Sequence, residues 1–115
     1  MNQPLIEPLV FEALQANAGA DFVLQLLEAF AEEAPQLAQQ LREAAAGGDS
    51  AQFETIAHSL KSNGVTFGAA RLAELAGRLE CHGLAGGPAA ISAAIDELSA
   101  EIAAALLALQ AAARP

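Results

Sequence analysis

Several residue types are scarce in this sequence, and each scarcity narrows the class of protein. The 115 residues include one cysteine, no tryptophan and no tyrosine. A lone cysteine excludes an intramolecular disulfide, and nothing in its use indicates an oxidising compartment. Only five residues are Lys or Arg against 14 Asp or Glu, which gives a formal net charge of −9. Because nucleic-acid binding needs a basic surface, this charge argues against a nucleic-acid partner and favours a protein partner.

A long uninterrupted apolar run is also missing, although 54% of the residues are hydrophobic. Charge, Gly or Pro breaks every apolar segment, and the N-terminus has no basic region followed by an apolar stretch. We therefore expect a cytoplasmic protein with no membrane partner. The apolar content is ample for one core, and the abundance of Ala favours helices packed through small side chains. The expected fold class is all-α, with one domain over residues 1–115.

Gly and Pro divide the chain into four substantial helical segments after a shorter opening one. Residues 1–20 indicate an irregular arm and a short helix. The next segment is predicted to begin with Asp21 as its N-cap, and Pro35 should kink it near residues 32–34 or divide it into two helices. The predicted boundaries of the remaining segments are the Asp49–Gln52 capping box, Gly68 or Ala69, Gly83 and Pro88.

Apolar residues recur at steps of three and four in these segments, which is typical of amphipathic helices. Because short loops favour antiparallel neighbours, residues 21–113 are predicted to form an up-down-up-down four-helix bundle, with a short additional N-terminal helix. The predicted core positions are Val23, Leu27, Phe30, Ala34, Leu37, Leu41, Phe53, Ile56, Ala57, Leu60, Gly64, Phe67, Leu72, Leu75, Ala76, Leu79, Ile91, Ile95, Leu98, Ile102, Ala105 and Leu109.

His58 is the residue of greatest chemical interest, because the predicted helix places it in water. At about 100° per residue it points about 150° away from the middle of its helix's apolar stripe. Thr55, Ser62 and Val65 project on the same exposed side. A lone exposed histidine is ordinarily a solvated residue without a role, so its surroundings in the sequence decide how it is interpreted.

Those surroundings read Ala57-His58-Ser59-Leu60-Lys61-Ser62, with Gly68 and Ala69 farther on. This stretch closely resembles the signature of the histidine-containing phosphotransfer (HPt) domain family, usually written Ala-His-x-Leu-Lys-Gly followed after five residues by Gly. The Glu-Glu-Ala-Pro run at 32–35 and the Gly-Asp pair at 48–49 extend the resemblance over nearly the whole chain. Family members are four-helix bundles with a phosphorylatable histidine on an exposed helix face.

The resemblance implies that His58 is the phosphoacceptor and that Lys61 offsets the charge of the phosphoryl group. Thr55, Ser62 and Val65 are candidate partner-docking residues. Ser62 departs from the family's glycine by adding a Cβ and a hydroxyl, which we expect to tune docking and not abolish it. The chemistry suits the residue type, because an imidazole has an unperturbed pKa of about 6.5 and is nucleophilic near pH 7.

By the same resemblance, the expected function is a monomeric relay between receiver-domain aspartates. The receivers would belong to response regulators and to a hybrid sensor histidine kinase. The chain lacks the clustered carboxylates of a Mg²⁺ site and the Gly-rich phosphate loop of a kinase. We therefore expect no cofactor of its own and no autokinase activity, with Mg²⁺ on the partner receiver domain. The alternative is a helical scaffold or a degenerate domain that binds receivers without carrying phosphate, a role that would survive replacement of His58.

The other polar residues near this segment favour ordinary structural roles. Arg71 and Arg78 add to the positive charge that follows His58, and both are expected to be solvated and paired with Glu74. Cys81 is expected to be a partly buried thiol. His82 is expected to be a cation or a cap at a helix C-terminus, because two adjacent residues without a further Cys or His cluster are a weak metal signal.

Overall fold

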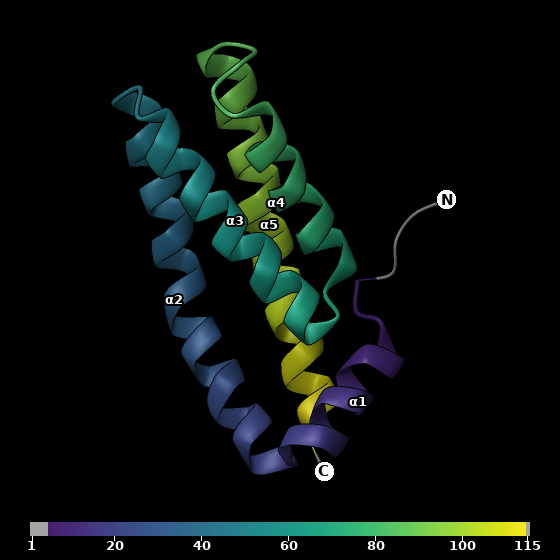
Figure 1. Cartoon of the computed structure of the whole chain (residues 1–115). Helices are drawn as coiled ribbons and strands as arrows, with labels where there is room; N and C mark the ends of the chain where they lie inside the picture. Colours follow the sequence, from purple (N-terminus) through teal and green to yellow (C-terminus); the bar gives the residue numbers. More distant parts are fainter. Residues whose placement is uncertain (1–4, 115) are drawn as a thin grey trace.

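The computed structural model describes residues 5–114, and all regular structure in this range is α-helical (Figure 1). This confirms the all-α class and the bundle with a short additional N-terminal helix. The helices are α1 (Pro8–Ala18), α2 (Ala20–Ala46), α3 (Ser50–Phe67), α4 (Ala70–His82) and α5 (Pro88–Ala113).

Helices α2 to α5 alternate in direction and close into a bundle, in which α3 packs on α2 and α4, and α5 packs on the same two helices. The α2–α3 and α4–α5 loops lie together at one end of this bundle (Figure 1). Helices α3 and α4 have 18 and 13 residues, whereas α2 and α5 have 27 and 26. The short α1 lies across the opposite end, where it contacts α2 and α3 and buries Phe11.

The core follows the predicted apolar stripes closely. All of the predicted core positions are buried except Leu37 and Leu75, which are half-buried at the edge of the core. The rings of Phe30 and Phe67 stack with their centroids 5.3 Å apart, which joins α2 to the end of α3. Each large side chain removed from water in this way contributes about 1.5–3 kcal/mol, so the stripes dominate the stability of the bundle.

The helix boundaries match most of the predicted signals. The side chain of Asp49 accepts a hydrogen bond from the backbone N–H of Gln52 at 3.1 Å, as expected of an N-cap. Gly68 ends α3 in the left-handed conformation with φ 76°, which costs a glycine little. Its N–H and that of Ala69 return to carbonyls of α3, which leaves the end of this helix well defined.

Two boundary predictions for α2 are wrong. Gly19, with φ 92°, is the N-cap residue, so α2 starts at Ala20 and Asp21 lies in its first turn, where a carboxylate favours the helix dipole. The alternative of two helices also fails, because α2 runs unbroken through Pro35. The kink near residues 32–34 stays a prediction. Within residues 5–114, no helix is long and apolar enough to cross a membrane.

Candidate functional site

The exposed face of α3 carries His58 in the middle of the helix. The imidazole is 59% exposed, as the helical periodicity predicts. Thr55, Ser62 and Val65 are exposed on the same side, and Val65 is 62% exposed despite its apolar side chain. We call this surface the His58 face, and it consists of Ala51, Glu54, Thr55, His58, Ser62 and Val65.

The packing of α4 on α3 decides what stands beside the imidazole. The two helices run in opposite directions, and Gly64 touches the backbone of Ala73 where they approach closely. Toward the N-terminus of α3, the aliphatic part of Lys61 lies against Gly77. Since Lys61 and His58 lie almost one turn apart, the next turn of α4 brings Glu80 to His58. Small residues in both helices therefore permit the approach that places an acidic side chain at the site.

Glu80 joins His58 and Lys61 through its two carboxylate oxygens. Its Oε2 lies 2.8 Å from Nδ1 of His58, and its Oε1 lies 2.9 Å from Nζ of Lys61. The side chain of Glu80 is 28% exposed, so solvent still reaches it. Hydrogen bonds from Lys61 and then from His58 hold the pKa of Glu80 below its usual 4.5, against a smaller opposing effect of desolvation. Glu80 is therefore ionised at neutral pH.

This contact determines which nitrogen of His58 is available. An ionised carboxylate only accepts hydrogen bonds, so Nδ1 of His58 carries the proton that it donates to Glu80. In the neutral ring Nε2 then holds the lone pair, and no group among residues 5–114 forms a hydrogen bond with it. The arrangement presents a nucleophilic nitrogen on an exposed helix face, and the hydrogen bond to Glu80 determines the tautomer of the ring.

Arg71 and Arg78 each pair with an acidic residue other than Glu80. Arg78 pairs with Glu74 at 2.7 Å, which confirms that prediction. Arg71 does not pair with Glu74, because it reaches across to the buried Glu101 of α5 at 2.9 Å. Of the basic residues described, Lys61 alone contacts the acidic partner of His58.

Cys81 and His82 lie at the end of α4. The prediction of a partly buried thiol is wrong, since Cys81 is exposed. It follows Leu79 by two residues, or about 200° around the helix, and therefore points away from the buried stripe. His82 is the basic residue of the last turn, as predicted. Across residues 5–114, no group of three or more His, Cys, Asp or Glu is placed to hold a metal ion.

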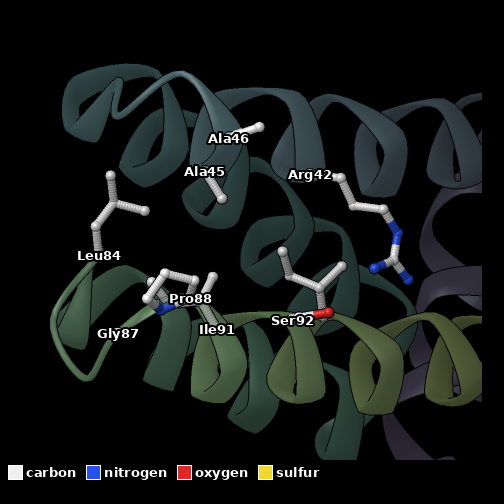
Figure 2. Close-up of a pocket in the computed structure, with 9 residues that line it drawn as sticks. Arg42, Ala45, Ala46, Leu84, Gly87, Pro88, Ile91 and Ser92 are labelled. Atoms are coloured by element: carbon white, nitrogen blue, oxygen red, sulfur yellow. The ribbon is translucent and has the colours of Figure 1, made fainter.

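A groove of about 430 Å³ lies elsewhere, between the end of α2, the α4–α5 loop and the start of α5 (Figure 2). Arg42 stands at one end, where it is bound to Asp96 at 2.7 Å. The groove shares no residue with the cluster of His58, Lys61 and Glu80, and its lining is mainly aliphatic. The lining residues are Arg42, Ala45, Ala46, Leu84, Gly87, Pro88, Ile91, Ser92 and Ile95.

Glu80 is the site residue that the sequence interpretation missed. It comes 22 positions after His58, outside the signature that drew attention to the histidine. A signal was present, because α3 and α4 are joined by a very short connection and must run antiparallel. Gly64 and Ala73 mark a close approach in such a pair. Because the helices are antiparallel, a residue several positions before Gly64, such as His58, lies near a residue a similar number of positions after Ala73, such as Glu80.

A comparison with known families identifies the chain. The model of the Hpt domain matches residues 25–112, which include all of α3 and α4 and hence His58, Lys61 and Glu80. This match spans well over half of the chain, and the protein therefore belongs to the Hpt domain family. Membership indicates a histidine phosphotransfer role in phosphorelays, and Hpt domains as a family are phosphotransfer carriers rather than true enzymes. No match was found among curated proteins or among solved structures.

Proposed function

We propose that this protein relays a phosphoryl group between receiver-domain aspartates through Nε2 of His58. The observation that carries the proposal is the hydrogen bond between Nδ1 of His58 and Glu80 on an exposed helix face. It leaves the nucleophilic nitrogen directed away from the carboxylate that holds the ring. Exposure also suits a group whose reaction partners are other proteins.

The transfer is a displacement at phosphorus. The lone pair of Nε2 attacks the phosphorus of an aspartyl phosphate, the new N–P bond forms, and the P–O bond to the aspartate breaks to release its carboxylate. The imidazole ring keeps its Nδ1 proton and becomes positively charged. Glu80, which accepts that proton's hydrogen bond, stabilises the charge as it develops. Attack by a second receiver's aspartate on the phosphohistidine reverses these steps and passes the group on.

Lys61 is proposed to offset the charge of the phosphoryl group. In the unphosphorylated protein it is bound to Glu80, with 39% of its side chain exposed. A dianionic phosphoryl group on the neighbouring imidazole would compete with Glu80 for the ammonium. Because Lys61 follows His58 by three residues, the two side chains lie on adjacent positions of the helix surface, and this exchange needs only a side-chain movement.

The proposed partners are receiver domains of response regulators and of a hybrid sensor histidine kinase, met in the cytoplasm by the monomer. The partner receiver is proposed to supply Mg²⁺ and most of the catalysis, and this chain is proposed to have no autokinase activity. The His58 face is the proposed docking surface, with Thr55, Ser62 and Val65 around the imidazole. Its small side chains allow a partner to approach the ring closely.

The direct test is transfer of radiolabelled phosphate from phosphorylated receiver domains. We expect acid-labile label on the wild type and none on His58→Gln. His82→Gln is a matched control, because His82 is also exposed on a helix and should be dispensable for labelling. A wild type that takes up no label from any receiver, or a His58→Gln variant that takes up as much, would refute the relay. Receiver binding without label transfer would instead support the scaffold alternative.

Lys61→Ala tests the second residue of the proposal. We expect it to fold normally, because the side chain lies at the surface, and to accept phosphate several-fold more slowly. Circular dichroism and urea unfolding check the fold, while single-turnover labelling measures the rate. A rate equal to that of the wild type removes Lys61 from the mechanism.

A further inference from the structure

The hydroxyl groups of α3 are not equally available to a partner. Beyond the first turn, α3 carries hydroxyls on Thr55, Ser59, Ser62 and Thr66. Three of them donate to the backbone carbonyl four residues earlier: Thr55 at 2.9 Å, Ser59 at 3.2 Å and Thr66 at 3.0 Å. Ser62 makes no such bond with any residue from 5 to 114. Its hydroxyl is exposed and available to a partner.

Ser62 also occupies a central position on the His58 face. It follows His58 by four residues, so it lies about 6 Å farther along the same side of the helix. A docking surface of ordinary size buries about 800 Å² on each partner, which corresponds to a disc with a radius of about 16 Å. An interface centred on His58 therefore covers Ser62 well inside its rim, where water is excluded.

When a docked partner covers the Ser62 hydroxyl, the affinity depends on which group the partner places against it. A buried hydroxyl without a hydrogen-bond partner is costly, whereas one that meets a suitable group contributes to binding. Two of its neighbours on this face supply no free hydroxyl donor, because Val65 is apolar and the hydroxyl of Thr55 already donates to a carbonyl of α3. The available donor at Ser62 thus discriminates between partners that present an acceptor at this point and partners that do not.

We propose that Ser62 is a specificity-determining residue, whose hydroxyl bonds to an acceptor on the receiver surface beside the receiver's phosphoacceptor aspartate. The inference rests on the proposed function in one respect, namely that the partner is a receiver domain. It does not require that phosphate be carried, because the bond forms on docking. Binding and transfer therefore test it separately.

The experiment measures the affinity of a panel of isolated, unphosphorylated receiver domains for wild type, Ser62→Ala, Ser62→Gly and Thr55→Val. Fluorescence anisotropy or calorimetry gives the Kd of each pair. For the receiver that the wild type binds most tightly, both Ser62 variants should bind roughly five- to tenfold more weakly. For receivers that the wild type binds poorly, the Ser62 substitutions should change the Kd by less than about twofold. The range of Kd values across the panel should therefore be narrower for the variants than for the wild type. Thr55→Val removes a hydroxyl already bonded within α3 and should leave the ranking unchanged.

Three outcomes overturn the proposal. The first is a Ser62→Ala variant that binds the preferred receiver as tightly as the wild type does. The second is an equal loss in Thr55→Val, which would show that the surface responds to any small change. The third is a Ser62→Ala variant whose Kd rises by the same factor for every receiver in the panel, because the hydroxyl would then not distinguish one partner from another. Failure of phosphate uptake by the wild type would refute the relay alone, since the binding comparison uses no phosphate.

Discussion

Gly64 of α3 lies so close to Ala73 of α4 that a Cβ on Gly64 would stand 2.8 Å from the Ala73 backbone nitrogen. The obstacle is backbone, which cannot rotate away as a side chain can. The contact holds the two helices at a separation that lets Glu80 reach His58. The chemistry of the imidazole therefore depends on a glycine nearly two turns away on its own helix.

Gly64→Ala should destabilise the protein even though alanine favours helices. The gain in helix propensity is about 1 kcal/mol, whereas overpacking a tight contact costs about 1–3 kcal/mol, and here no rotamer change relieves it. Gly77→Ala is the matched control, because its added Cβ meets only the flexible Lys61 chain at 3.3 Å. Urea unfolding should show a loss for Gly64→Ala and no loss or a small gain for Gly77→Ala. Equal stabilities for the two variants would contradict this account of the helix contact.

Removing the carboxylate of Glu80 should release the imidazole tautomer. In the wild type, ¹⁵N chemical shifts at a pH where the ring is neutral should report a protonated Nδ1 and an unprotonated Nε2 for His58. Glu80→Ala should show a mixture of the two tautomers and take up phosphate roughly three- to tenfold more slowly, the effect of losing one charge-assisted hydrogen bond at a solvent-exposed site. Glu74→Ala, which removes a carboxylate that pairs only with Arg78, should alter neither readout.

The lowered pKa of Glu80 predicts how stability depends on pH. Because the folded state favours the ionised carboxylate, its contribution is present above the usual pKa of 4.5 and is lost as the pH falls through and below that value. The difference in unfolding free energy between the wild type and Glu80→Gln should therefore shrink between about pH 5 and pH 3. Glu33→Gln, at an exposed position of α2, controls for the general change in net charge. A difference that stays constant over this range would contradict the ion pair with Lys61.

The pair of Arg71 and Glu101 predicts an asymmetric response to mutation. Glu101 is only 7% exposed, its Oε1 pairs with Arg71, and its Oε2 lacks a hydrogen-bond partner among the described residues. Arg71→Met should lower the unfolding free energy by about 1–3 kcal/mol, because it leaves a buried carboxylate uncompensated. Glu101→Met should stay within about 1 kcal/mol of the wild type, since a buried ion pair adds little beyond well-packed apolar side chains. Thermal and urea unfolding of the two variants and of the double variant measure these losses. A larger loss of unfolding free energy for Glu101→Met than for Arg71→Met would contradict the prediction.

Helical periodicity alone was enough to place most of the core and the exposed side of α3. Phe53, Leu60 and Phe67 are buried while His58 is exposed, because positions on one helix are related by a fixed rotation per residue. The prediction of the N-cap of α2 was wrong because a neighbouring residue occupies that position. Gly19 displaced Asp21 as the N-cap of α2, since glycine adopts the positive φ needed between α1 and α2.

The order of the residues was enough to predict the helical class, the apolar stripes, the exposed histidine with its family-like signature, and the lysine three residues beyond it. These features are local, since each depends on the order of residues within a single helix. The pairing of Glu80 with His58 and Lys61, and of Arg71 with Glu101 instead of Glu74, became clear from the packed helices and not from the sequence. Those partners lie on different helices, so their contact depends on how closely α3, α4 and α5 pack. Contacts such as that of Gly64 with Ala73 determine this packing distance.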